Sequence, residues 1–224
     1  MRRRIRRDLG GDVANVDVRI AEGDPAEQLI TLAKQEKCDL IVTGIARNEP
    51  LGRLFIGSTV NKLIRKAKAP VLVVTNRGTH AYQKICVATD FSESSRAALV
   101  TAASLFPESE IVLIHGDNVP FGGIQNIRDI PDHVRTMERM YGATFLDSTP
   151  IPKALRQRIR LHIEQGDPER LVWDYVRDQE VDLTVIGSHG KGAVFDILIG
   201  STTKLLLESI AGDMLIVIDP RSRK

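Results

Sequence analysis

The chain contains one pattern twice, at an offset of 143 positions, and the two copies align without a gap. The shared positions fall on turns and strand-like runs. The period is too long for a solenoid, so the repeat indicates two homologous domains. We place them at residues 1–78 and 82–220. The matching stretches are Gly23-Asp24-Pro25 with Gly166-Asp167-Pro168, Asp39-Leu40 with Asp182-Leu183, Gly44 with Gly187, Ile56-Gly57-Ser58-Thr59 with Ile199-Gly200-Ser201-Thr202, and Leu72 with Leu215.

The second copy alternates short apolar runs with signals that start helices. Ser92 is placed to cap one helix, and Asp167, followed by Pro168, to cap another. Alternation of helices with continuously apolar strands predicts an α/β fold, a doubly wound open parallel sheet. The expected strands are 85–88, 111–115, 158–164, 183–186 and 214–218, and the expected helices are 92–105, one from about 132, 168–179 and 201–210.

The first copy is incomplete, because residue 1 aligns with residue 144. It has counterparts of strands three, four and five, at 16–20, 40–43 and 71–74, but not of strands one and two. A sheet without these strands exposes unpaired edges and apolar faces. Three explanations remain open: the copy is a fragment, it begins downstream of the natural start, or another chain completes it.

Composition narrows the classes of partner. The net charge is +2, so we expect no nucleic-acid partner despite the arginines near the N-terminus. No apolar run approaches the roughly 18 residues of a membrane span, and no signal region follows the basic start. Cys38 and Cys86 form no CxxC or metal-binding pattern. We therefore expect a cytoplasmic protein without a membrane partner.

Glycines after the fourth expected strand point to a phosphate. Gly187 and Gly190 have no Cβ, so the backbone there can turn sharply and approach an oxygen closely. Gly200, Ser201 and Thr202 open a helix, where free N–H groups and the helix dipole favour an anion. The two hydroxyls add donors or, less readily, help to hold Mg²⁺. This spacing suits a nucleotide.

A second stretch is expected to face these glycines. With a strand order of 3-2-1-4-5, the order reverses between strands one and four, and ligands bind at such a reversal. Asp90 ends strand one, where it could accept a hydrogen bond from a ribose hydroxyl or orient a metal. Ile114 and His115 end strand two, where backbone groups could meet an adenine edge.

Each of these residues also has a purely structural interpretation. Glycines after a strand often only form turns, and Ser201 is an ordinary helix cap. Asp90 fits equally well as the residue that leads into a helix, and His115 as a hydrogen-bonded structural group. His189 fits an exposed loop. Trp173, within a helix, is expected in the core.

Gly187, Gly190, Gly200 and Ser201 resemble the signature of the nucleotide-binding branch of the universal stress protein family: Gly, two residues, Gly, nine residues, Gly, then Ser or Thr. The stretch 87–92 is similar to that family's first strand and its Asp, and 166–168 to its turn before the third helix. The likeness covers residues 82–219, and residues 12–76 resemble the later part of a second such domain.

The resemblance implies a strand order of 3-2-1-4-5, ATP in the crevice with or without Mg²⁺, a role in stress survival, and slow or absent hydrolysis. It also implies dimer-like pairing through the fifth strands, here 71–74 with 214–218 in one molecule, and it is compatible with a homodimer. The candidate nucleotide-binding residues are Asp90, Ile114, His115, Gly187, His189, Gly190, Gly200, Ser201 and Thr202, and we name no catalytic or metal-ligating residue.

The first copy departs from the signature. Arg47 replaces the second glycine and Pro50 lies in the loop that follows, so we expect no independent nucleotide site there. The sequence leaves a second function class open and argues against a third. A scaffold that binds no nucleotide and only mediates dimerisation or protein interaction is the main alternative. An enzyme on a related fold would need a Ser-Gly-Gly-x-Asp-Ser run or a His-x-x-His element, and the sequence has neither.

Overall fold

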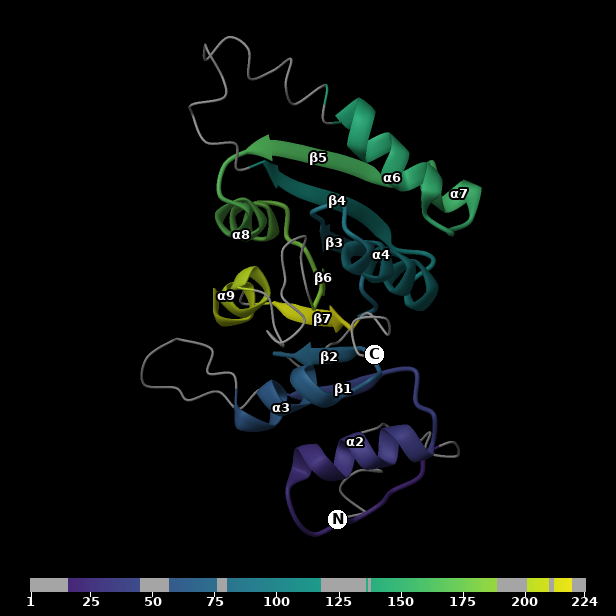
Figure 1. The fold of residues 1–224 in the computed structure, drawn as a ribbon, viewed down its shortest axis with the longest axis vertical. Coiled ribbons are helices and arrows are strands. Elements are labelled where there is room, and N and C mark those ends of the chain that lie inside the picture. Colours follow the sequence, from purple (N-terminus) through teal and green to yellow (C-terminus); the bar gives the residue numbers. More distant parts are fainter. Residues whose placement is uncertain are drawn as a thin grey trace.

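A computed structural model of the chain describes residues 16–44, 57–75, 80–117, 136, 138–188, 201–209 and 212–218. The strands in these ranges form one seven-stranded sheet. Their order across the sheet is β1-β2-β7-β6-β3-β4-β5 (Figure 1). The strands are β1 Ile41–Gly44, β2 Val71–Val74, β3 Lys84–Ala88, β4 Glu110–Asp117, β5 Arg160–Gln165, β6 Leu183–Gly187 and β7 Asp213–Val217.

The five strands of the second copy run parallel. β3 lies between β4 and β6, with Cys86 opposite Val112 on one side and opposite Thr184 on the other. β5 continues the sheet beyond β4, and β7 continues it beyond β6. The sheet order therefore reverses between β3 and β6, and this is where an open α/β sheet receives ligands.

The two copies meet at an antiparallel pair of strands. β2 pairs with β7, with Val71 opposite Ile216, Leu72 opposite Leu215 and Val73 opposite Met214. β1 then adds to β2 in parallel. The sheet is therefore mixed, and it is continuous from the first copy into the second.

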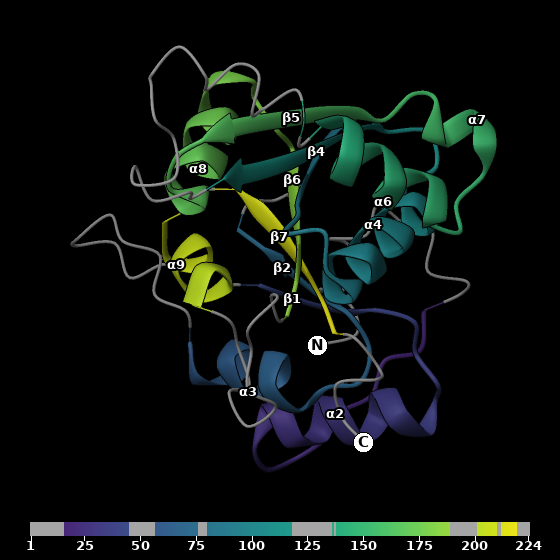
Figure 2. The same ribbon diagram turned by 45° about the horizontal axis from the view of Figure 1, so that its top comes forward.

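Helices cover both faces of the sheet, which confirms the α/β class (Figure 2). The part of the chain that the structure describes has no helix long and apolar enough to cross a membrane. The helices are α2 Pro25–Gln35, α3 Ser58–Lys66, α4 Glu93–Leu105, α6 Ala143–Ser148, α7 Lys153–Arg156, α8 Pro168–Asp178 and α9 Ser201–Ser209, with a π-helical turn η3 Glu138–Gly142.

Capping side chains set the starts of three helices. The Asp24 carboxylate accepts from Glu27 N at 3.0 Å at the start of α2. Asp167 accepts from the N–H groups of Glu169 and Arg170 at the start of α8. The Ser92 hydroxyl accepts from Ser95 N at 3.3 Å at the start of α4. These bonds satisfy backbone donors that have no partner inside the helix, and the caps predicted at Ser92 and Asp167 are confirmed.

Two apolar layers enclose the sheet. One layer, which includes Cys86, Ile114, Val172 and Met214, lies on the side of α8. The other, which includes Val87, Leu99, Val185 and Leu215, lies on the side of α4. Successive strand residues alternate between the layers because side chains in a strand point to opposite faces.

Two expected strands need correction. Residues 16–20 form no strand, and Ile20 is 74% exposed. Their counterpart β5 pairs with β4, and the printed sequence has no counterpart of β4 in the first copy, so residues 16–20 lack their ladder partner. β5 begins at Arg160 because Ile159 still bonds back to Leu155. The start of the helix expected from about 132 lies outside the described residues and stays a prediction.

Trp173 also differs from the expectation. It is 38% exposed on α8, with the Arg177 guanidinium 4.4 Å from its ring centroid. Its neighbour Val172 takes the buried position instead.

Candidate functional site

The carboxyl ends of β3 and β6 lie side by side at the reversal of strand order. Val87 is opposite Val185, and the chain continues from these ends to Asp90 and Gly187. A Cβ built on Gly187 would lie 2.4 Å from Ser94 Oγ, so the end of β6 directly contacts the first turn of α4. Two candidate stretches that are far apart in the sequence are thus brought to one edge of the sheet.

A tight turn carries Asp90 from β3 into α4. The Asp90 carboxylate accepts from Ser92 N at 3.0 Å. Thr89 Oγ1 accepts from Phe91 N at 2.9 Å and donates to Ser95 Oγ at 3.0 Å. Phe91 has a φ of +59°, which is uncommon for a bulky residue and costs backbone energy. The structural interpretation of Asp90, as the residue that leads into a helix, is therefore confirmed.

His115 ties the end of β4 to this turn. Its Nδ1 lies 2.7 Å from Thr89 O, and because a carbonyl only accepts, Nδ1 is the donor. Its ring lies 4.5 Å from the Phe91 ring. His115 is thus the hydrogen-bonded structural group that one interpretation expected.

Ile114, which precedes His115 in β4, is buried, and its carbonyl oxygen accepts a hydrogen bond from Thr89 N at 2.8 Å. The carbonyl is therefore already part of the sheet. The oxygen has a second lone pair, which could accept a hydrogen bond from a ligand.

Gly187 is a glycine because α4 leaves no room for a side chain. The Cβ position lies 2.4 Å from Ser94 Oγ and 2.8 Å from Ser94 O, and real side chains essentially never come this close. At Gly44, its counterpart in the first copy, the nearest such atom is 3.9 Å away. Sequence reasoning missed Ser94, although a small residue in the first turn of a helix is a signal of close packing.

The strand end at Gly187 is held by two further bonds. Thr203 Oγ1 donates to Gly187 O at 3.1 Å, and Ser188 N donates to Val217 O at 2.8 Å. Thr203 was not among the candidates, because nothing in its spacing distinguishes it from an ordinary helix residue. These bonds fix the start of the glycine segment relative to α9 and β7.

A carboxyl group lies at the start of α9. Ser201 is the first residue of this helix, and the side chain of the next residue, Thr202, hydrogen-bonds to Glu169 of α8. Burial raises the pKa of Glu169 above its ordinary value and the nearby charge of Asp167 adds to this, whereas the Thr202 bond acts in the opposite direction. Glu169 was missed because the contact joins two helices and has no local pattern.

The same place in the first copy is built differently. Lys62 of α3 pairs with Asp24 at 2.9 Å, and Lys66 pairs with Glu27 of α2 at 2.7 Å. The hydrogen bond from Lys62 lowers the pKa of Asp24. The counterparts of these lysines in α9 are Leu205 and Ser209, so these two positions supply no cation for α8.

Three candidates, His189, Gly190 and Gly200, lie outside the described residues, as do Arg47 and Pro50 of the first copy. Within the described ranges, no group of three or more His, Cys, Asp or Glu residues is arranged to hold a metal ion.

Comparison with known proteins gives one family. The sequence model described as "Universal stress protein family" matches residues 2–75 and 81–217. A universal stress protein of Mycolicibacterium smegmatis is 25% identical over 212 residues, which is 90% of this chain and 68% of that protein. The stress response protein NhaX of Bacillus subtilis is 42% identical over 66 residues, 30% of this chain and 40% of that protein.

Solved structures share the fold. A putative universal stress protein from Pseudomonas aeruginosa superposes with a TM-score of 0.74 at 20% identity, over 98% of this chain and 78% of that one. A universal stress protein from Archaeoglobus fulgidus gives 0.65 at 20% identity, over 96% of this chain and 79% of that one.

Proposed function

Because this chain belongs to the universal stress protein family, we propose that its second copy binds an adenine nucleotide, ATP, as a regulatory module of the stress response. The observation that carries the proposal is the placement of Asp90 and Gly187 at the reversal of strand order. The glycine signature that begins at Gly187 supplies the chemistry for a phosphate.

In this proposal the nucleotide lies across the carboxyl ends of β6, β3 and β4. The phosphates lie at Gly187, Gly190 and the start of α9, where Ser201 adds a hydroxyl donor and Thr202 adds a second one when its hydroxyl leaves Glu169. The ribose lies near Asp90, and the adenine near the end of β4. Mg²⁺ would accompany the triphosphate.

Binding, rather than turnover, is the proposed activity. The sequence offers only His189 as a candidate general base within the glycine segment. The protein would work in the cytoplasm, through a change in what it contacts when nucleotide is bound. The first copy would contribute packing across β2 and β7 and no nucleotide site of its own.

A scaffold that binds no nucleotide is the second candidate, and two contacts favour it. Ser94 alone is enough to require a glycine at position 187. Asp90 already accepts a bond from Ser92 N. Both residue types would then be explained by the fold without any ligand.

Calorimetric titration of the full chain with ATP, with and without Mg²⁺, separates the two candidates. We expect one ATP per chain, with binding lost in Gly200→Val and Gly190→Arg. Gly57→Val is the matched control, because a Cβ at Gly57 meets nothing within 4 Å and the position belongs to the first copy. Unchanged binding in both second-copy variants, or no binding by the natural sequence, would contradict the proposal, and two ATP per chain would contradict the assignment of the first copy.

A further inference from the structure

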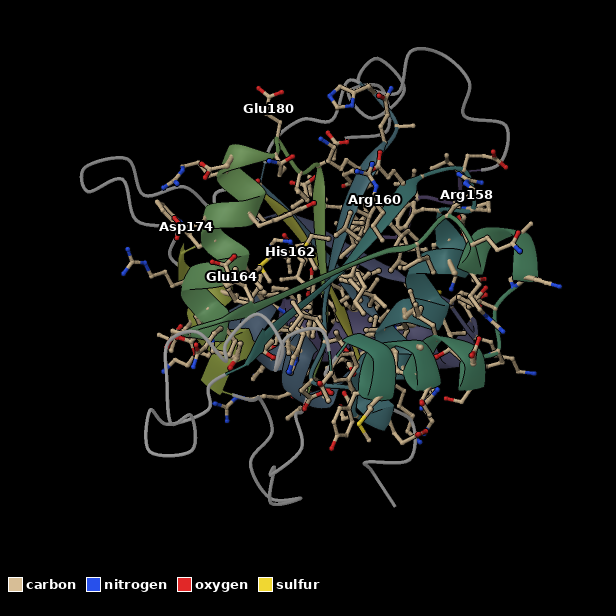
Figure 3. All side chains as sticks on the ribbon, turned by 90° about the horizontal axis from the view of Figure 1, so that it is seen from above. Arg158, Arg160, His162, Glu164, Asp174 and Glu180 are labelled. Atoms are coloured by element: carbon tan, nitrogen blue, oxygen red, sulfur yellow. The ribbon has the colours of Figure 1, made fainter. Side chains whose placement is uncertain are left out.

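One arginine of α4 lies in a different environment from the arginines of the sheet edge. Figure 3 looks onto β5, where Arg158 and Arg160 lie on the exposed side. The Arg160 side chain is 69% exposed and pairs with Glu110. The Arg96 side chain is only 20% exposed, and its Nε donates to Glu93 of the same helix at 3.1 Å. A largely buried cation needs several partners, so the other contacts of Arg96 show which part of the fold it holds.

Arg96 holds the end of α6. Its Nη1 donates to Phe145 O at 3.1 Å, to Ser148 Oγ at 2.7 Å and to Thr149 Oγ1 at 3.0 Å. The last carbonyls of a helix have no partner inside it, so a guanidinium at this place satisfies them. The same guanidinium lies 4.7 Å from the centroid of the Phe145 ring, within the range of a cation–π contact. One side chain therefore ties α4 to the end of α6.

Phe145 connects the end of α6 to the turn that carries Asp90. The Phe145 side chain is buried, and its ring centroid lies 5.5 Å from that of Phe91, with the two planes at 66°. This near edge-to-face arrangement is favourable for aromatic rings. Because the Phe91 ring also contacts His115, it is held between α6 and the end of β4.

The backbone of Phe91 needs this support. Its φ of +59° lies in the left-handed region, which bulky residues rarely adopt and which persists only where the surroundings hold it. Without the ring contacts, we expect Phe91 to return to a negative φ. The chain direction between Asp90 and Ser92 would then change, and with it the 3.0 Å hydrogen bond that joins them. The ring contacts therefore favour one of two arrangements of the turn.

We propose that the end of α6 controls the affinity of the candidate nucleotide site through Arg96, Phe145 and Phe91. This proposal rests on the proposed function, because it requires that the nucleotide meets Asp90. The three side chains are positioning residues, which act on the nucleotide through the turn that places Asp90. Coupling of this kind is reciprocal, so bound ATP also stabilises the contacts of Arg96 with the end of α6.

Calorimetric titration of the Arg96→Lys variant with ATP tests the proposal. Lysine keeps the charge, but its compact ammonium cannot reproduce the planar fork and the stacking of the guanidinium. We expect the dissociation constant for ATP to rise at least about fivefold, within the usual range for residues that couple two sites. Phe145→Leu, which keeps an apolar side chain but removes the ring, should have the same effect.

Arg156→Lys is the matched control. Arg156 lies in α7 and holds the same end of α6, because its Nη2 donates to Thr149 O at 3.0 Å and to Ile151 O at 3.4 Å. These contacts are with backbone carbonyls and do not involve the rings. Arg156→Lys should therefore leave the dissociation constant for ATP within about twofold of the natural value.

A variant at Phe91 tests the route of the coupling. Glycine adopts a positive φ as readily as a negative one, so in Phe91→Gly the turn no longer depends on the rings. Arg96→Lys should then leave the affinity for ATP unchanged when it is added to Phe91→Gly. A general loss of packing would instead give the same change in both backgrounds.

Hydrogen exchange without nucleotide is the second measurement, because the Ser92 amide donates to the Asp90 carboxylate. This amide should exchange faster in Arg96→Lys and at the natural rate in Arg156→Lys. If this pattern is found but the natural sequence binds no ATP, the proposed function is wrong and the link from α6 to the turn is supported.

Three outcomes would overturn the control of the site by α6. One is an unchanged affinity for ATP in both Arg96→Lys and Phe145→Leu. Another is a Ser92 amide whose exchange is the same in Arg96→Lys as in the natural sequence. The third is an equal loss of affinity in Arg156→Lys, which would show that any loosening of the end of α6 has this effect, whatever happens to the rings.

Discussion

Leu72 and Leu215 lie opposite each other at the centre of the antiparallel pair formed by β2 and β7. They are also equivalent residues of the two copies. On either side the partners exchange: Val71 faces Ile216, and Val73, the equivalent of Ile216, faces Met214, the equivalent of Val71. A two-fold axis therefore passes between the two leucines, and the copies meet as the subunits of a symmetric dimer would.

This pair predicts a large stability effect. Leu215 is fully buried and Leu72 nearly so, in one apolar layer. Leu215→Ala should lower the free energy of unfolding by about 2–5 kcal/mol, measured by urea denaturation. The double variant with Leu72→Ala should be non-additive, because the two side chains are in contact. Leu205→Ala, at a half-exposed position of α9, is the control, with an expected change within about 0.5 kcal/mol.

The two equivalent glycines, Gly187 and Gly44, should respond differently to one added methyl group. Gly187→Ala forces a carbon against Ser94 and should cost about 1–3 kcal/mol. Gly44→Ala has 3.9 Å to its nearest neighbour and should be tolerated. Thermal unfolding of both variants measures the difference. An equal loss of stability in both variants would contradict the close packing of α4 against the end of β6.

The two cysteines should differ in reactivity. Cys38 is exposed, whereas Cys86 is fully buried in β3, and burial raises the pKa of its thiol. The thiolate is the reactive form, so Cys86 should be inert in the folded protein. A maleimide should label Cys38 quickly and Cys86 only after denaturation, and peptide mapping locates the label. Rapid labelling of Cys86 under native conditions would contradict the buried position of β3.

The Tyr82 hydroxyl makes stability sensitive to alkaline pH. It donates to the Asp213 carboxylate at 2.6 Å, and burial, followed by that bond, raises the pKa of Tyr82. A phenol whose pKa is higher in the folded state than in the unfolded chain contributes stability below the unfolded value of about 10, and loses it as pH rises above that value. The free energy of unfolding should therefore fall above about pH 10, and Tyr82→Phe should reduce this fall.

Tyr175→Phe is the matched comparison for Tyr82→Phe. Burial also raises the pKa of Tyr175, and the charge of Glu110 adds to this, but no hydrogen bond to a carboxylate contributes. Urea titrations at pH 8 and above give the comparison. A pH dependence unchanged by Tyr82→Phe would contradict the link to Asp213.

Local signals were readable from the sequence, and long-range ones were not. Asp167 and Ser92 could be predicted as caps because the donor lies two or three residues from the acceptor. Residues 16–20 have strand-like residues, but a strand forms only where a partner offers its ladder. Position 187 needs a glycine because α4 packs against it, and Glu169 contacts Thr202 because α8 packs against α9. Both contacts join residues that are far apart in the sequence.

One side chain, Asp213, bonds to both sides of the linker between the copies. Asp213 accepts from Thr75 N at 2.8 Å, from Thr75 Oγ1 at 3.0 Å and from Tyr82, so it holds both ends of the connection between β2 and β3. Cutting the peptide bond between these anchors would leave both ends attached to β7. The covalent link is then less important than the sheet, and a nicked molecule should migrate as one particle until it is denatured.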